Sequence, residues 1–113
     1  AKGRETFGKP LMERQAIQWM LADAALEIHA ARLVVYNAAQ VRAKNRPFEV
    51  ESSMAKLMAS EVAGKVLDAA IQVHGGMGLA KELPLERWYR ELRTRRIGEG
   101  PSEVHRMVIA RNL

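Results

Sequence analysis

Glu99 carries the carboxylate that is best placed to do chemistry. It lies between Gly98 and Gly100 and directly before Pro101, a residue that suits the first turn of a helix. Flanking glycines let a backbone adopt dihedrals closed to other residues and approach a ligand closely, so the carboxylate is placed as a general base would be. The local sequence alone nevertheless favours a solvated loop glutamate. The adjacent helix N-terminus would stabilise the anion and weaken it as a base, whereas exclusion of water would strengthen it.

Two other stretches could contact anions. The glycine-rich run 75–78 resembles a nucleotide loop only superficially, because a dinucleotide-binding fingerprint follows a strand and opens a helix. Here the glycines follow a helical segment, which favours a helix C-cap whose free amides could still contact a phosphate. The arginines at positions 87, 90, 93, 95 and 96 form a basic run that Glu86 and Glu91 interrupt. A solvated or salt-bridged helix face is favoured there over a nucleic-acid site, with contact to an anionic substrate tail as an alternative.

Metal and nucleophile chemistry find no support in the sequence. The histidines, at positions 29, 74 and 105, have no metal-type ligand one helical turn away, so we predict no metal site. The chain has no cysteine, which excludes disulfides, thiolate zinc sites and cysteine nucleophiles. Ser102 has no base near it in sequence and is interpreted as a helix cap.

The elements that position these residues are predicted to be helices. Ala1–Lys9 is polar and is expected to be an extended lead-in. Apolar residues at three- and four-residue steps predict a helix from Pro10 to about Ala43, and a second from near Glu49–Ser53 to His74. Shorter helices follow from Pro84, with Leu85, Trp88, Tyr89 and Leu92 on one face, and from Pro101, with Val104, Met107 and Val108 inward. We therefore predict an all-α, four-helix up-and-down bundle with two long antiparallel helices and two short ones.

The amino-acid composition restricts the fold class and the kinds of partner further. The 113 residues are 48% hydrophobic and 27% charged, which is enough for one domain. Seventeen alanines against two threonines favour helices. No apolar run exceeds four residues, so we expect neither a membrane span nor a signal peptide. The net charge of +5 favours anionic partners without choosing among them.

The chain resembles the C-terminal helical domain of the acyl-CoA dehydrogenases along essentially its whole length, and three segments carry the match. The first is Arg4–Pro10, continuing to Gln15, which is similar to the family's R-x-x-F-G stretch. The second is Gln72–Gly78, similar to Q-x-x-G-G-x-G, followed by Leu83–Arg87 and Tyr89-Arg90. The third is Arg96–Arg106, similar to I-x-E-G-[TP]-S-E-x-x-R.

The resemblance implies an FAD-dependent reaction. Family members abstract the α-proton of an acyl-CoA thioester with a carboxylate while the β-hydrogen leaves as hydride to flavin N5, giving a trans-2-enoyl-CoA. The resemblance puts that base at Glu99, and a flavin against the site would exclude water. It also implies an electron-transfer acceptor protein and a homo-oligomer, a tetramer or dimer, with no nucleic acid. The expected location is cytoplasmic in a bacterium and the mitochondrial matrix in a eukaryote.

The resemblance also assigns binding roles. Matching the FAD contacts of a neighbouring subunit are Arg4, Phe7, Gln15, Gln72, Gly75 and Gly76. Pro101 and Glu103 match positions near the subunit's own FAD, and Gly100 and Arg111 match positions near the substrate. Pro101 stands where threonine is frequent, so a hydroxyl contact to flavin is lost. Gly98 stands where tyrosine is frequent, which removes bulk beside the thioester and widens the acyl pocket.

The family's N-terminal helical domain and central β domain have no counterpart in these 113 residues. We therefore expect a C-terminal domain, 1–113, that is inactive by itself. The alternative is a helical oligomerisation module without catalysis, and a basic nucleic-acid binder ranks third.

Overall fold

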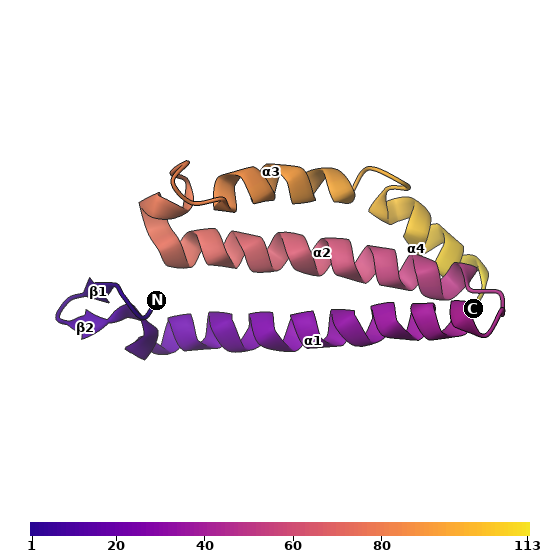
Figure 1. Ribbon diagram of the computed structural model, residues 1–113, viewed down its shortest axis with the longest axis horizontal. Coiled ribbons are helices and arrows are strands. Elements are labelled where there is room, and N and C mark those ends of the chain that lie inside the picture. The colour runs from indigo at the N-terminus through magenta and orange to yellow at the C-terminus, as the bar shows by residue number, and fades with distance from the viewer.

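A computed structural model describes residues 1–113 as an elongated molecule of 56 × 24 × 23 Å. Figure 1 shows a small N-terminal hairpin followed by four helices. In chain order the elements are β1 (Glu5–Thr6), β2 (Lys9–Pro10), the 3-10 turn η1 (Leu11–Glu13), α1 (Gln15–Ala43), α2 (Glu49–His74), the 3-10 turn η2 (Gly75–Gly78), α3 (Leu85–Arg95) and α4 (Ser102–Arg111). The predicted all-α class with two long and two short helices is confirmed.

The long helices α1 and α2 form an antiparallel hairpin, as predicted (Figure 1). Helix α1 ends at Ala43, where Asn45 adopts a positive φ of 53° before Pro47. The guanidinium of Arg42 lies 5.3 Å from the centroid of the Phe48 ring and covers the connection. Ala31 and Ala38 of α1 are buried, and their small side chains let the two helices approach closely.

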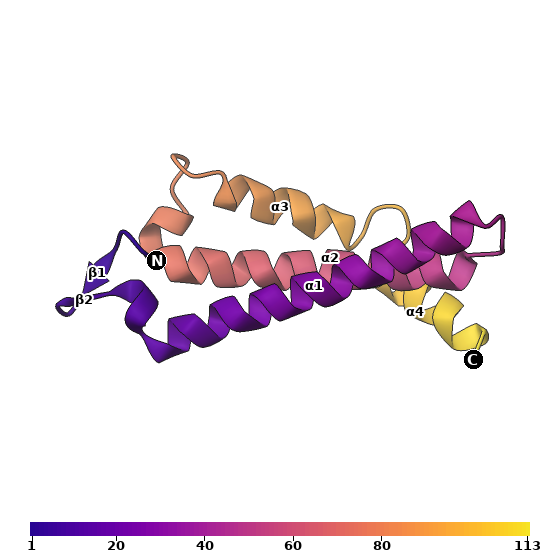
Figure 2. The same ribbon diagram turned by 60° about the horizontal axis from the view of Figure 1, so that its bottom comes forward.

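Helix α2 is central, because it packs against each of the other three helices. Figures 1 and 2 show α1 running along α2, while α3 and α4 return along α2 one after the other. Helix α2 ends at His74, as predicted, because Gly75 adopts a φ of 60°. Neither long helix contains a stretch apolar enough to cross a bilayer.

The N-terminal segment differs from the prediction. The expected helix start at Pro10 is wrong, because Pro10 pairs with Glu5 in the β1–β2 hairpin. Phe7 and Gly8, with φ of 50° and 71°, make the tight turn between the strands. Leu11 then donates its amide to the carbonyl of Arg4 at 2.7 Å, and α1 begins only at Gln15. The turn therefore folds the expected extended lead-in back on itself.

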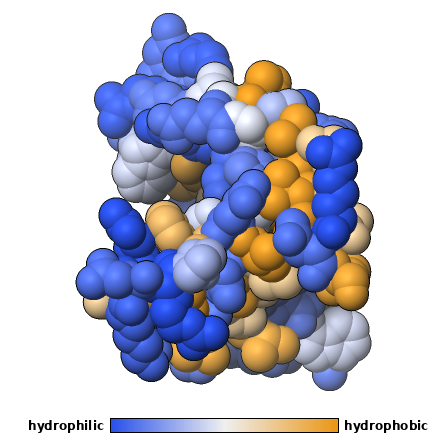
Figure 3. Space-filling model, turned by 90° about the vertical axis from the view of Figure 1, so that its right-hand side faces the viewer, coloured by the Kyte–Doolittle hydropathy of each residue, from blue (hydrophilic) through white to orange (hydrophobic).

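The short helices are less covered than expected. Trp88 and Tyr89 of α3 remain exposed, whereas Leu85 is buried and Leu92 half-buried. On α4 the inward placement of Val104 and Met107 is wrong, and both are exposed. The reason is that α2 covers only one side of these helices. Figure 3 shows apolar side chains still visible among polar ones on the molecule's right-hand end in the view of Figure 1.

Candidate functional site

The loop between α3 and α4 carries Glu99 and is closed at its base. The amide of Ser102 donates to the carbonyl of Arg96 at 3.1 Å, across residues 97–101. Glu99 has a φ of 57° and Gly100 a φ of 95°, so two successive residues adopt positive φ. That conformation costs a non-glycine residue about 1–2 kcal/mol. Such strained residues gather at functional sites, and the side chain of Glu99 is exposed.

Gly100 is required at its position for a second reason. A Cβ atom there would lie 2.9 Å from Nε2 of His105, because the imidazole ring packs directly beneath the Gly100 backbone. Both ring nitrogens of His105 are buried and have no hydrogen-bond partner. The ring therefore fills the space between the Gly100 backbone and α4.

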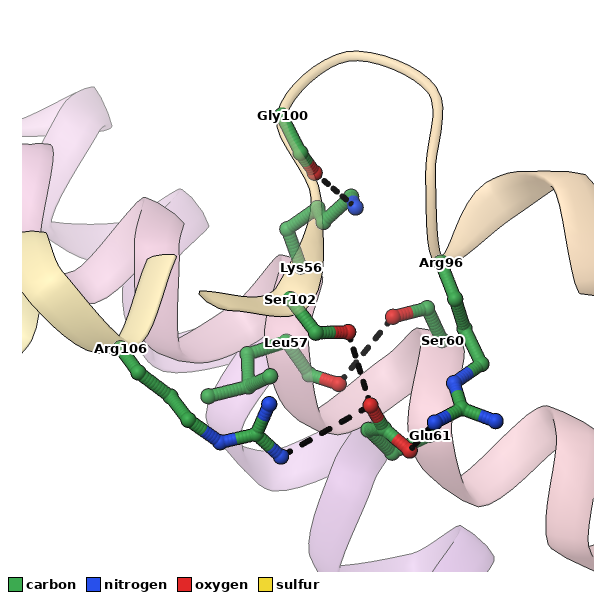
Figure 4. Close-up of polar contacts among 8 residues, drawn as sticks. All are labelled: Lys56, Leu57, Ser60, Glu61, Arg96, Gly100, Ser102 and Arg106. Carbon is green, nitrogen blue, oxygen red and sulfur yellow. Dashed lines mark hydrogen bonds and ion pairs between the residues drawn. The ribbon is translucent and has the colours of Figure 1, made fainter. Parts of the chain in front are cut away.

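A polar cluster on α2 lies beneath this loop (Figure 4). Glu61 accepts a hydrogen bond from the hydroxyl of Ser102 at 2.7 Å and pairs with Arg96 at 3.0 Å and Arg106 at 3.7 Å. The hydrogen bond from Ser102 holds the pKa of the Glu61 carboxyl below its ordinary value, against the effect of partial burial and with support from both arginines. Lys56 donates to the carbonyl of Gly100 at 2.5 Å.

Sequence reasoning missed this cluster and misassigned Ser102. The helix-cap interpretation of Ser102 is wrong, because its hydroxyl donates to Glu61 rather than to a backbone group of α4. Arg96 is salt-bridged, as one of the favoured interpretations of the basic run had it, although its partner Glu61 lies on α2 rather than on its own helix. The rest of that basic run behaves as favoured, with Arg87 and Arg90 paired to Glu91 and Glu86 at 3.7 and 3.9 Å. Glu61 lies about 40 residues away from its loop partners, and no local spacing signals it.

A second group of predicted residues meets where the N-terminal segment contacts the end of α2. The guanidinium of Arg4 donates to the carbonyl of His74 at 2.8 Å. A Cβ atom on Gly75 would lie 2.9 Å from Nη1 of the same guanidinium. Arg4, His74 and Gly76 line an open cavity of about 590 Å³ together with Leu11, Val73 and Met77. The structure thus joins the first and second motif segments, which are 70 residues apart.

The other predicted site residues are mostly exposed. Phe7 lies at the hairpin tip and is 98% exposed, with the Arg14 guanidinium 5.9 Å from its ring centroid. Four polar residues also face solvent: Gln15, Gln72, Glu103 and Arg111. Pro101 is half-buried at the start of α4. The group around Arg4 lies at the hairpin end of the molecule, whereas the Glu99 loop lies farther along it, between α3 and α4 (Figure 1).

Comparison with known proteins identifies the chain's relatives. The family model for the acyl-CoA dehydrogenase C-terminal domain matches residues 1–113. Probable acyl-CoA dehydrogenase YngJ of Bacillus subtilis is 50% identical over the whole chain, which covers 30% of that protein. Two solved structures superpose with a TM-score of 0.95: butyryl-CoA dehydrogenase from Megasphaera elsdenii, at 41% identity over 98% of this chain and 29% of that one, and an FAD complex of PigA, at 31% identity over 99% and 29%.

The match is complete for this chain and partial for its relatives. The chain spans about 30% of the length of the curated proteins that it matches. The helices, the hairpin and the Glu99 loop described above all lie within the matched residues. The chain therefore belongs to the acyl-CoA dehydrogenase family, in which it corresponds to the C-terminal domain.

Proposed function

We propose that this chain is the C-terminal domain of an FAD-dependent enzyme that dehydrogenates acyl-CoA thioesters to trans-2-enoyl-CoA, with Glu99 as the base. The observation that carries the proposal is the Glu99 loop, in which a non-glycine residue is held at positive φ with its carboxylate accessible. The family membership supplies the reaction class. A carboxylate that receives an α-proton must reach the substrate and hold one orientation, and a strained backbone at an accessible carboxylate is typical of a functional site.

The residues around Arg4 fit the chemistry of FAD. Arg4 presents a guanidinium suited to paired contacts with a pyrophosphate. Gly76 brings its backbone to the open cavity, and Gly75 lies directly beside the guanidinium. Phe7 offers an exposed flat ring on which an aromatic group could pack. Gln15 and Gln72 would add amide contacts, with Pro101 and Glu103 near the flavin of the same subunit. The group around Arg4 would hold the FAD of a neighbouring subunit, and the FAD near Pro101 and Glu103 would supply the acceptor for the hydride that leaves the β-carbon.

The chain's own residues would then handle the α-proton. The exposed carboxylate of Glu99 would accept it at an oxygen, while Gly100 and Arg111 contact the substrate. Because Glu99 is exposed in residues 1–113, water must be excluded by surfaces outside these residues, by cofactor or by substrate. An electron-transfer protein would reoxidise the flavin.

The decisive test replaces Glu99 with Gln in the full-length protein that contains this segment. Glu99→Gln is expected to abolish dye-linked dehydrogenation of acyl-CoA, because an amide cannot accept the proton, while FAD stays bound by its visible absorption. Glu91→Gln is the matched control: this carboxylate on α3 is 61% exposed and pairs only with Arg87, so turnover should not change. Retained turnover in Glu99→Gln would refute the base assignment.

The 113-residue chain alone is expected to be inactive and to bind little flavin. The two groups of proposed FAD contacts lie in different parts of the molecule, so one chain offers only a partial site to each flavin. Purification of this chain with added FAD measures the outcome directly. A stoichiometric yellow complex would overturn the expectation.

A helical assembly module is the second candidate, and one observation favours it. Trp19, Leu26 and Leu33 recur at seven-residue steps on α1 and are 55–68% exposed, so they form an uncovered apolar stripe. We propose that α1 contributes to a homo-oligomer whether or not the chain is catalytic. Light scattering of wild type and Leu26→Glu tests the contact through α1 in either case, and acyl-CoA turnover of the full-length protein separates the two candidates. A pure assembly module would oligomerise without flavin, and Glu99→Gln would not change its oligomeric state.

A further inference from the structure

A single carboxylate on α2 holds both ends of the loop that carries Glu99. Arg96 is the last residue before the loop and Ser102 the first residue of the helix after it. One oxygen of Glu61 lies 3.0 Å from the Arg96 guanidinium, and the other accepts from the Ser102 hydroxyl at 2.7 Å. Figure 4 shows the two side chains converging on Glu61 from opposite sides.

Backbone hydrogen bonds hold only the two ends of the loop: Ile97 and Gly98 donate to the carbonyl of Thr94, and Ser102 donates to that of Arg96. Between these ends the side chains bury little apolar area, since Ile97 is 60% exposed and Gly98 and Glu99 are also exposed. The positive φ at Glu99 is unfavourable without external support, whereas Gly100 adopts its positive φ at little cost. Polar contacts with α2 must therefore supply much of what keeps the loop in this shape.

Lys56 provides a second contact near the top of the loop. Its ammonium group donates to the carbonyl of Gly100 at 2.5 Å, directly after Glu99. Ser102 is 2% exposed, so water cannot replace Glu61 as the acceptor for its hydroxyl without rearrangement. Lys56 and Glu61 thus hold the loop at its top and base from one rigid helix.

We propose that Glu61 and Lys56 are positioning residues for Glu99: they act through the loop and fix where its carboxylate stands relative to the substrate. The inference rests on the proposed function of Glu99 as the base. Neither residue touches the reacting atoms, so their role differs from that of a catalytic residue. A misplacement of about 1 Å is enough to cost roughly a hundredfold in rate.

The test uses the full-length protein loaded with FAD and compares Glu61→Gln and Lys56→Met with wild type. Both variants are expected to lower kcat by roughly ten- to a hundredfold, with KM changed less than about threefold and FAD content unchanged. Most proposed contacts to substrate and FAD lie outside this loop, whereas the orientation of the Glu99 carboxylate matters most in the transition state. Hydrogen exchange of the bonded loop amides, those of Ile97, Gly98 and Ser102, should accelerate at least about tenfold, while residues 62–72 of α2 keep their protection. Lys65→Met is the matched control, since it removes an exposed lysine from the same helix that pairs with Glu27.

The outcomes separate the two proposals. If Glu99→Gln is inactive while Glu61→Gln and Lys56→Met keep kcat and loop exchange within about twofold of wild type, the positioning role is overturned and the base assignment stands. If Glu99→Gln retains turnover, the proposed function itself fails. If Glu61→Gln loses FAD or unfolds, the Lys56→Met variant tests the positioning role by itself. Methionine keeps most of the aliphatic part of the lysine side chain, so only the contact with Gly100 is lost. A wild-type kcat and loop exchange in Lys56→Met would then overturn the inference.

Discussion

Gly78 offers the sharpest test of the packing between α2 and the turn that follows it. Gly78 is the last residue of η2 and is buried. It packs against the backbone of α2 at Ile71. A Cβ atom at this position would lie 2.7 Å from the carbonyl oxygen of Ile71 and 2.9 Å from its Cα. Both atoms belong to the backbone of α2, so the clash cannot be relieved by rotating a side chain. Gly78→Ala must therefore displace η2 from the helix.

Substitutions that overpack a protein interior typically cost about 1–3 kcal/mol of stability, and we expect Gly78→Ala to fall in this range. A chain of this length loses about 4 °C of melting temperature per kcal/mol, so the expected shift is roughly 4–12 °C. Gly76→Ala is the matched control, because the same substitution two residues earlier meets no atom within 4 Å. It should change the free energy of unfolding by less than about 0.5 kcal/mol.

Thermal and urea unfolding of the 113-residue chain, followed by far-ultraviolet circular dichroism, measures both variants. We expect the two variants to differ clearly in melting temperature, with Gly78→Ala less stable and Gly76→Ala close to wild type. Coincident melting curves for Gly78→Ala and wild type would show that η2 can move away from Ile71 at no cost. The close contact would then carry no stability.

Two further predictions concern α2. The pKa of Glu61 is lowered in the folded chain. The carboxylate therefore contributes fully to the free energy of unfolding above about pH 4.3, the ordinary glutamate pKa. This contribution is lost as the pH falls through the lowered pKa. Glu61→Gln should therefore flatten the acid side of the stability curve in urea titrations from pH 7 to 3; an unchanged slope would contradict the assignment. Gly64→Ala should raise the free energy of unfolding by up to about 1 kcal/mol, because alanine favours a helix interior more than glycine does. The added Cβ would meet only the Arg96 side chain, at an ordinary contact distance of 3.9 Å. A lower melting temperature of Gly64→Ala would show that this contact is unfavourable.

Local chemistry in the sequence determined where most helices end. Proline at 47 and the glycines from 75 onward act through the backbone dihedrals of their own neighbourhood, so the ends of α1 at Ala43 and α2 at His74 could be predicted. Pro84 and Pro101 marked the starts of the short helices for the same reason. The candidate base was also visible, because the glycines that shape its loop are its immediate neighbours.

Tertiary structure alone decided which partners those residues have. Glu61 contacts Arg96 and Ser102 across about 40 positions, and Arg4 meets His74 across 70. Hydrogen bonds and ion pairs depend on where side chains lie in space, and sequence spacing reports on that only within a few turns of one helix. The N-terminal hairpin, the buried hydroxyl of Ser102 and the uncovered faces of α3 and α4 therefore became visible only once α2 was seen at the centre of the fold.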